Sequence, residues 1–119
     1  DIAPLWEREE AWNLARISRL ERELPRPRER VVLDFGCGIG GFLKRAQGSF
    51  GRVVGFDLSS RMVKLHRETG IVCHDRIDDL PGDIDTIVLF HVLEHVPRPW
   101  ELLRELVVRF PRADRVVIE

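Results

Sequence analysis

Several protein classes are excluded by what this sequence lacks. It has two cysteines, Cys37 and Cys73, too few for the disulfide framework of a small secreted domain. No apolar run approaches the roughly 20 residues that a membrane-spanning helix needs. Neither sign of charge dominates, because 19 basic residues face 20 acidic ones, for a net charge of -1. This balance gives no general electrostatic case for nucleic acid or an anionic membrane as a partner, although a local basic patch could still hold RNA.

The length and composition indicate one globular domain over residues 1–119. A chain of 119 residues is long enough for a single hydrophobic core and too short for two. Hydrophobic residues make up 44% of it, which argues against disorder. No signal peptide follows Asp1, so we expect a soluble protein of the cytoplasm, and one that could be a piece of a longer chain.

The first part of the chain has the hydrophobic period of a helix. Residues 5–24 carry apolar side chains at three- and four-residue spacing, with arginine and glutamate between them. We expect Asp1 or an adjacent group to cap this helix, and Pro25 and Pro27 to end it. The predicted apolar positions are Leu14, Ile17, Leu20 and Leu24.

Short apolar runs then alternate with helical segments. The runs predict strands, and the segments between them predict the helices that join parallel strands. This alternation is typical of a three-layer α/β doubly wound sheet. We expect the acidic stretch 75–85 to be a solvated loop with at most a helical turn. The predicted strands are 31–35, 52–57, 71–73, 84–90 and 115–119. The predicted helices after the first are 41–47, 59–69 and 100–110.

The turn after the first predicted strand is rich in glycine. Gly36, Gly38 and Gly41 match the pattern G-x-G-x-x-G between a strand and a helix, which is the context that the pattern requires. Residues without Cβ let the backbone approach a ligand, and the following helix offers unpaired N–H groups. Asp57 ends the second strand 21 positions after Gly36, where a carboxylate can accept hydrogen bonds from ribose hydroxyls. The pattern favours a cofactor site, although glycines also form ordinary turns.

Asp34, two positions before Gly36, bears on which cofactor binds. A carboxylate there would repel the pyrophosphate of NAD, but it suits the amino group of an amino acid. This contrast favours S-adenosylmethionine and leaves an NAD-binding oxidoreductase as the weaker alternative. The other interpretation of Asp34 is a turn carboxylate bonded to backbone N–H groups.

Four segments together resemble a known family, the class I S-adenosylmethionine-dependent methyltransferases, and within it the type 11 and type 12 members. The resemblance covers residues 31–119, and an opening helix before residue 25 also fits it. The motifs are specific as an ordered set. The matching segments are 32–40, 53–59, Asp75 with 79–81, and 91–99.

The resemblance implies a role for each matching position. Asp34 and the backbone of the glycine turn would hold the methionine part of the cofactor, and Asp57 would bind the ribose. Leu58 would pack against the adenine, and Asp75 would accept from its amino group. Residues leaving the fourth strand would border the transferred methyl group. The implied cofactor-binding residues are Asp34, Gly36, Cys37, Gly38, Asp57, Leu58, Asp75, Arg76, Phe90 and His91.

Methyl transfer needs little from the protein beyond positioning. The sulfonium methyl group is already activated, so a general base is required only when the acceptor must lose its proton early. His91 and His95 are candidates for that base, or else residues that begin a helix, so the catalytic residue is unassigned. His91, Glu94 and His95 also have the spacing of a metal-binding motif, but no further ligand is evident and we expect no metal ion.

The resemblance raises a question of length. Methyltransferases of this class usually have seven strands in the order 3-2-1-4-5-7-6, and this chain stops within the fifth. We expect the order 3-2-1-4-5, with an open fifth-strand edge that invites pairing with another chain or a second copy. The chain is then C-terminally truncated, completed by a partner or dimer, or a reduced module.

The predicted function is methyl transfer from S-adenosyl-L-methionine to a small-molecule acceptor, with S-adenosyl-L-homocysteine as the product. The neutral charge argues against a nucleic-acid acceptor, as does the absence of an Asn/Asp-Pro-Pro-aromatic motif after the fourth strand. The main alternative is a non-catalytic module that binds S-adenosylmethionine or its demethylated product.

Overall fold

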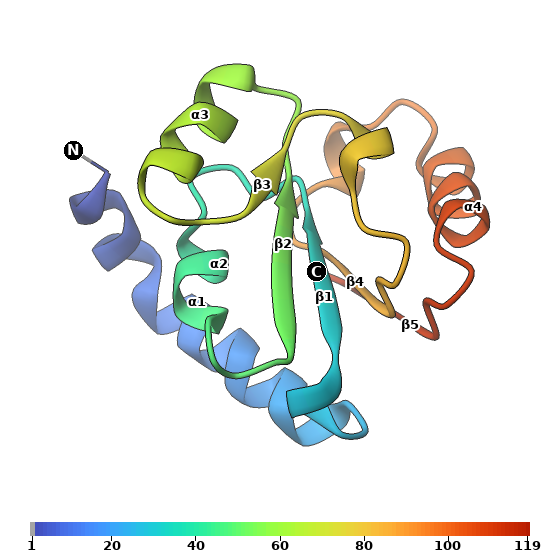
Figure 1. Cartoon of the computed structure of the whole chain (residues 1–119), viewed down its shortest axis with the longest axis horizontal. Coiled ribbons are helices and arrows are strands. Elements are labelled where there is room, and N and C mark those ends of the chain that lie inside the picture. The colour runs from blue at the N-terminus through green and yellow to red at the C-terminus, as the bar shows by residue number, and fades with distance from the viewer. Residues whose placement is uncertain (1) are drawn as a thin grey trace.

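The computed structural model describes residues 2–119. Five parallel strands form one sheet at the centre of the molecule (Figure 1). The strands are β1 (Val31–Phe35), β2 (Arg52–Phe56), β3 (Cys73–His74), β4 (Thr86–Leu89) and β5 (Arg115–Ile118). Their order across the sheet is β3–β2–β1–β4–β5, and each strand runs parallel to its neighbours. The predicted fold class and strand order are confirmed.

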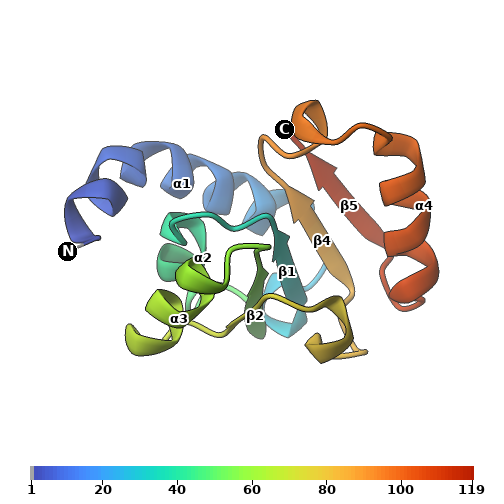
Figure 2. The same ribbon diagram turned by 90° about the horizontal axis from the view of Figure 1, so that it is seen from above.

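Helices cover both faces of the sheet. Helices α1 (Ala3–Glu23), α2 (Gly41–Ala46) and α3 (Ser60–Glu68) lie on one face, and α4 (Pro99–Arg109) lies on the other (Figure 2). The connections contain three 3-10 turns, η1 (Pro27–Glu29), η2 (Ile77–Asp79) and η3 (Leu93–His95). The cap predicted at Asp1 lies outside the described residues. Within residues 2–119, no helix combines the length and the apolar character needed to cross a membrane.

The two faces of β1 contribute to two separate apolar cores. Val32 packs with side chains from α1, α2 and α3, whereas Leu33 and Phe35 pack with side chains from α4. Because successive side chains of a strand point to opposite faces, Asp34 shares the face of Val32. Strand β1, which is apolar except for Asp34, therefore carries a carboxyl group to the α1 side of the sheet.

The buried face of α1 differs from the predicted one. Ile17 and Leu20 are buried as expected, but Leu14 is 48% exposed and Asn13 is buried instead. Both positions fit the helical period, because they precede Ile17 by three and four residues. The helix is oriented so that Asn13 and Asp34 line the same pocket. The prediction for Leu14 was wrong because periodicity alone does not separate these two orientations of the helix.

The third strand lies later in the chain than predicted. In place of 71–73, the strand is Cys73–His74, which pairs with Gly55 and Phe56 of β2. The N–H of Ile71 donates instead to the carbonyl oxygen of His66 at 2.9 Å, which closes the end of α3. Cys73 consequently lies opposite Gly55.

Gly55 is a point of very close packing between β2 and its neighbours. A Cβ at this position would lie 2.4 Å from Cδ1 of Leu43 and 2.9 Å from Sγ of Cys37. We expect Gly55→Ala to lower the free energy of unfolding by about 1–3 kcal/mol, because both neighbours are themselves buried. Urea unfolding measures this change. Gly82→Ala is the control, since a Cβ there meets no atom within 4 Å, and equal stability of the two variants would contradict the prediction.

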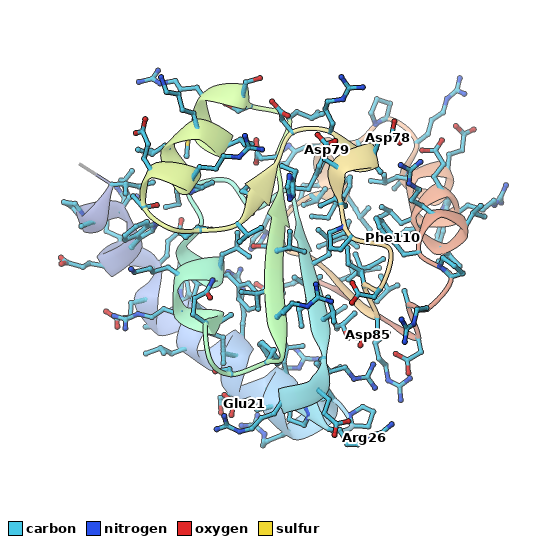
Figure 3. All side chains as sticks on the ribbon, in the orientation of Figure 1. Glu21, Arg26, Asp78, Asp79, Asp85 and Phe110 are labelled. Carbon is cyan, nitrogen blue, oxygen red and sulfur yellow. The ribbon has the colours of Figure 1, made fainter. Side chains whose placement is uncertain are left out.

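In the acidic segment after β3, Asp78 and Asp79 are exposed, as predicted, whereas Leu80 and Ile84 are buried in the core. Figure 3 shows Asp78 and Asp79 on η2. Asp78 pairs with Arg109 of α4, and this hydrogen bond lowers the pKa of the Asp78 carboxyl. Asp83 pairs with Arg52 at the start of β2. Exposed ion pairs of this kind add little stability, so the segment is a solvated boundary of the sheet.

The strand β5 forms one edge of the sheet. It pairs with β4 on one side and with no strand of residues 2–119 on the other. Val116 and Ile118 are exposed on it. This is the open edge expected from the sequence, and it presents unpaired backbone groups to a further strand.

Candidate functional site

The glycine turn between β1 and α2 is held against β2. The N–H groups of Gly36 and Cys37 both donate to the carbonyl oxygen of Phe56, at 2.8 and 3.0 Å. Gly36 has a φ of +83°, and a Cβ there would lie 2.8 Å from Cγ2 of Val92. Glycine is therefore required at this position both by the backbone conformation and by the space available.

Asp57, directly after β2, bonds to the same turn. Its Oδ2 accepts from the N–H of Gly38 at 2.9 Å, and its Oδ1 accepts from the N–H of Ser59 at 3.0 Å. A carboxylate has about four acceptor positions, so about two remain for a ligand. Leu58, the next residue, is 83% exposed despite its apolar side chain. A carboxylate and an exposed apolar surface therefore lie side by side at the end of β2.

Asp34 lies next to the turn and is only 3% exposed. Burial raises the pKa of its carboxyl to about 7, while the Arg16 guanidinium opposes this increase and the Asp57 carboxylate adds to it. The carboxyl group is thus close to half ionised at neutral pH. A cation brought to this position would favour its ionised form.

Arg16 connects α1 to the ends of β4 and β5. Its Nη2 donates to Oε1 of Glu119 at 2.6 Å, and its Nη1 donates to Oδ1 of Asn13 at 3.0 Å. The guanidinium carbon lies 4.5 Å from the centre of the Phe90 ring. On the other side of the same amide, the buried Nδ2 of Asn13 has no hydrogen-bond partner in the described part of the chain. This nitrogen has almost no accessible surface and lies against Gly41, so a ligand in the neighbouring pocket does not reach it.

Two pockets meet at Gly36. The first has a volume of about 310 Å³ and lies between α1 and the glycine turn, with Arg16 and Asp34 in its wall. The second has a volume of about 510 Å³ and lies between the end of β2 and the segment after β4, with Asp57 and Leu58 in its wall. Because Gly36 lines both, one extended ligand could occupy the two pockets together.

A family model described as a methyltransferase domain matches residues 6–111. The chain belongs to this methyltransferase domain family. It is 38% identical over 85 residues to the ubiquinone biosynthesis O-methyltransferase of Xanthomonas euvesicatoria, a match that covers 61% of this chain and 35% of that protein. The chain thus spans about a third of the length of this curated relative.

Solved methyltransferases share the fold of this domain. An S-adenosylmethionine-dependent methyltransferase from Archaeoglobus fulgidus is 27% identical, with a TM-score of 0.59 over 85% of this chain and 48% of that one. One from Mesorhizobium loti is 28% identical, with a TM-score of 0.59 over 75% of this chain and 45% of that one. The chain spans about half of each solved structure.

Most residues predicted for the site of this methyltransferase domain lie around the two pockets. Asp34, Cys37, Gly38 and Phe90 line the first pocket, Asp57, Leu58 and His91 line the second, and Gly36 lines both. Asp75 and Arg76 line neither pocket. The neighbouring Ile77 lines the second pocket instead. The roles given to Asp75 and Arg76 stay predictions.

The contributions of α1 and of Ile77 were missed in the sequence. An apolar face drawn through Leu14 assigns the arginines and the asparagine of this helix to the solvent side. A signal was present, because Asn13 stands four residues before Ile17, at a position where the period expects an apolar side chain. Ile77 is likewise an apolar residue within an acidic segment.

The backbone is strained at His91, directly after β4 and Phe90. Its φ is 56°, in a region that residues other than glycine rarely adopt. The ring lies between two carboxylates, with Nδ1 3.4 Å from Oε2 of Glu94 and Nε2 3.5 Å from Oε1 of Glu119. His91 also lines a third pocket of about 430 Å³, together with Trp12 and Arg19 of α1. The imidazole therefore stands between the second and third pockets.

Proposed function

We propose that this chain is the cofactor-binding part of an S-adenosylmethionine-dependent methyltransferase that methylates a hydroxyl group of a small molecule. The observation that carries the proposal is the polar lining of the first pocket, to which Asp34 contributes a buried carboxyl group and Arg16 a guanidinium. Opposite charges in one pocket suit an amino acid, which carries both an ammonium and a carboxylate.

The amino-acid part of the cofactor fits the first pocket. Asp34 would accept from the ammonium group, which supplies the cation that this buried carboxyl lacks. Arg16 would donate to the carboxylate. Phe90 closes the pocket beneath the guanidinium of Arg16. A pyrophosphate has no counterpart for Asp34, and this favours S-adenosylmethionine over NAD.

The nucleoside part fits the second pocket. Asp57 keeps about two acceptor positions for the ribose hydroxyls while it holds the turn. Leu58 and Ile77 line the same pocket and would contact the adenine with apolar surface. Leu58 is exposed in the chain alone, and such a ligand would cover it.

The third pocket suits a methyl acceptor. The relative from Xanthomonas euvesicatoria is named an O-methyltransferase, and this name supports a hydroxyl acceptor. When bound, the cofactor supplies an activated methyl group on a sulfonium. His91 borders this pocket and could take the proton of the hydroxyl, with Glu119 and Glu94 to stabilise the imidazolium. Trp12, exposed on α1, offers an aromatic surface to the acceptor.

Calorimetric titration with S-adenosylhomocysteine tests the cofactor assignment, with NAD as the control. We expect S-adenosylhomocysteine to bind and NAD to show no binding. Binding of NAD alone would overturn the proposal in favour of an oxidoreductase. Where the cofactor binds, methyl transfer from labelled S-adenosylmethionine to phenolic and catecholic acceptors tests the activity. Tight cofactor binding with no methylated acceptor would favour a non-catalytic binding module.

Arg16→Met tests the contact with the carboxylate of the cofactor. The variant keeps an apolar stem over Phe90 but removes the guanidinium. We expect its affinity for S-adenosylhomocysteine to fall by roughly 10- to 100-fold, since a hydrogen bond to a charged group contributes about 1.5–3 kcal/mol. Its affinity for 5′-methylthioadenosine, which has no amino acid, should stay unchanged. Arg19→Met is the matched control on the same helix. Equal losses for both ligands would contradict the assignment.

Two further predictions concern the cellular location of the enzyme and its pairing along β5. We expect it to act in the cytoplasm, which cell fractionation tests. A further strand, from the remainder of a longer chain or from a second copy, is proposed to pair with β5 along its open edge.

A further inference from the structure

Three metal-ligating side chains converge behind the glycine turn. Cys37 of the turn, His66 of α3 and Cys73 of β3 each bring a ligand atom within 4.8 Å of the other two. Within residues 2–119, this is the group of three or more such side chains whose ligand atoms lie this close together. His91, Glu94 and His95, which have the spacing of a metal-binding motif, do not form such a group. The two sulfur atoms are 3.4 Å apart.

A missing side chain allows this arrangement. A Cβ on Gly55 would lie 2.9 Å from Sγ of Cys37 and 3.2 Å from Sγ of Cys73. The two thiols therefore meet across the backbone of β2, in the space that any other residue would fill. Both cysteines are buried, so the cluster is shielded on most sides.

His66 contributes one ring nitrogen to this cluster, and the metal site requires that nitrogen to be Nδ1. The residue is 0% exposed, and its Nε2 lies 2.6 Å from the carbonyl oxygen of Gly38. Because a carbonyl oxygen only accepts, Nε2 carries the proton and Nδ1 keeps a lone pair. Nδ1 is buried and has no partner in the described part of the chain. A metal-bound histidine commonly donates its other ring N–H to a backbone carbonyl in this way.

We propose that Cys37, His66 and Cys73 bind one Zn²⁺ ion through two thiolates and an imidazole. In tetrahedral coordination with Zn–S bonds of about 2.3 Å, two sulfurs lie about 3.8 Å apart. The observed 3.4 Å requires them to separate by only a few tenths of an ångström. Three protein ligands leave the fourth position of a tetrahedral zinc ion to water. This inference goes beyond the proposed methyl transfer and does not depend on it.

Charge explains why the ligand is a divalent cation. Two bare thiolates beside Asp34 and Asp57 would repel one another, and Zn²⁺ neutralises both. Metal binding must then release protons, so the affinity rises with pH.

Cobalt substitution tests the site in the reduced, metal-free chain. We expect one Co²⁺ per chain, with a thiolate-to-cobalt charge-transfer band and the intense visible bands of tetrahedral cobalt, and displacement by Zn²⁺. Calorimetry with Zn²⁺ in two buffers of different ionisation enthalpy should show proton release. No uptake, or uptake without the charge-transfer band, would overturn the proposal.

Variants assign the ligands. Cys73→Ala and His66→Asn should weaken Zn²⁺ binding more than the roughly 10- to 100-fold that loss of an outer partner costs. His74→Asn is the matched control, because its Nδ1 is also buried and unpaired but its side chain points to the other face of β3. Unchanged affinity in both ligand variants would refute the site.

A third readout keeps the test valid if a ligand variant does not fold. In the native chain, Zn²⁺ should protect both cysteines from alkylation during brief exposure to denaturant. Mass spectrometry measures the number of alkylated thiols. A chain whose reduced form takes up no metal, and whose thiols form a Cys37–Cys73 disulfide in air, would overturn the metal site. Protection by Zn²⁺ with one ion per chain supports it.

Discussion

Affinity for S-adenosylhomocysteine is expected to fall in mild acid, and Asp34→Asn is expected to abolish this dependence on pH. The native chain should bind about 100-fold more weakly at about pH 5 than at about pH 8. The reason is that a carboxyl with a pKa of about 7 is ionised to only about one part in a hundred at the lower pH. Calorimetry across this range measures the effect.

The groups that face Asp34 determine the size of this effect. Arg16 of α1 is the cation that opposes the raised pKa, and Asp57 after β2 is the anion that adds to it. Glu9 of α1 lines the same pocket. The ammonium of the ligand adds the cation that favours ionised Asp34. Asp34→Asn should bind weakly at both pH values, and a native chain with a flat profile would contradict the assigned contact.

The same carboxyl group should affect stability in the opposite direction. Burial raises the pKa of Asp34 from 3.8 to about 7, so the native state binds more protons than the unfolded state between these values. The free energy of unfolding therefore decreases as the pH rises from about 4 to about 7, by at most about 4 kcal/mol. Asp34→Asn lacks this contribution and should be the more stable chain at about pH 8. Urea unfolding of both chains at the two pH values provides the check.

Asp57→Ala should weaken the binding of S-adenosylhomocysteine by at least about 100-fold. The variant loses two charge-assisted hydrogen bonds to the ribose, each contributing roughly 1.5–3 kcal/mol. It also leaves the N–H groups of Gly38 and Ser59 without their acceptor, which loosens the turn. Calorimetry on a variant shown to be folded by circular dichroism measures the loss.

A modified ligand separates the two effects of Asp57→Ala. The native chain should prefer S-adenosylhomocysteine to its 2′-deoxy analogue, whereas the variant should bind both alike. A loosened turn alone would preserve the preference, and that result would mean that Asp57 does not contact the ribose. Asp79→Ala is the matched control, since Asp79 is an exposed carboxylate on η2 (Figure 3). Its affinity should equal that of the native chain.

Local patterns in the sequence were enough to predict most of the strands and helices and the glycine turn. Local periods predicted the strands and helices, and the strand order that the family resemblance implied is confirmed. Glycines at fixed spacing and Asp57 after β2 placed the turn and a carboxylate together, and Asp57 does bond to Gly38. Such features depend on residues close in the chain or on adjacent strands, so they can be predicted without knowing how the helices pack.

The contribution of α1 to the site and the meeting of the two thiols depend on contacts between residues far apart in the chain. Arg16 bonds to Glu119, 103 positions away, and Cys37 contacts Cys73, 36 positions away. The raised pKa of Asp34 likewise depends on the burial that α1 and the turn create together. Helical periodicity allowed either Leu14 or Asn13 to face the sheet, and packing placed Asn13 there. The energy of a buried charge or an unpaired donor depends on every group around it, and those groups come together only when the chain folds.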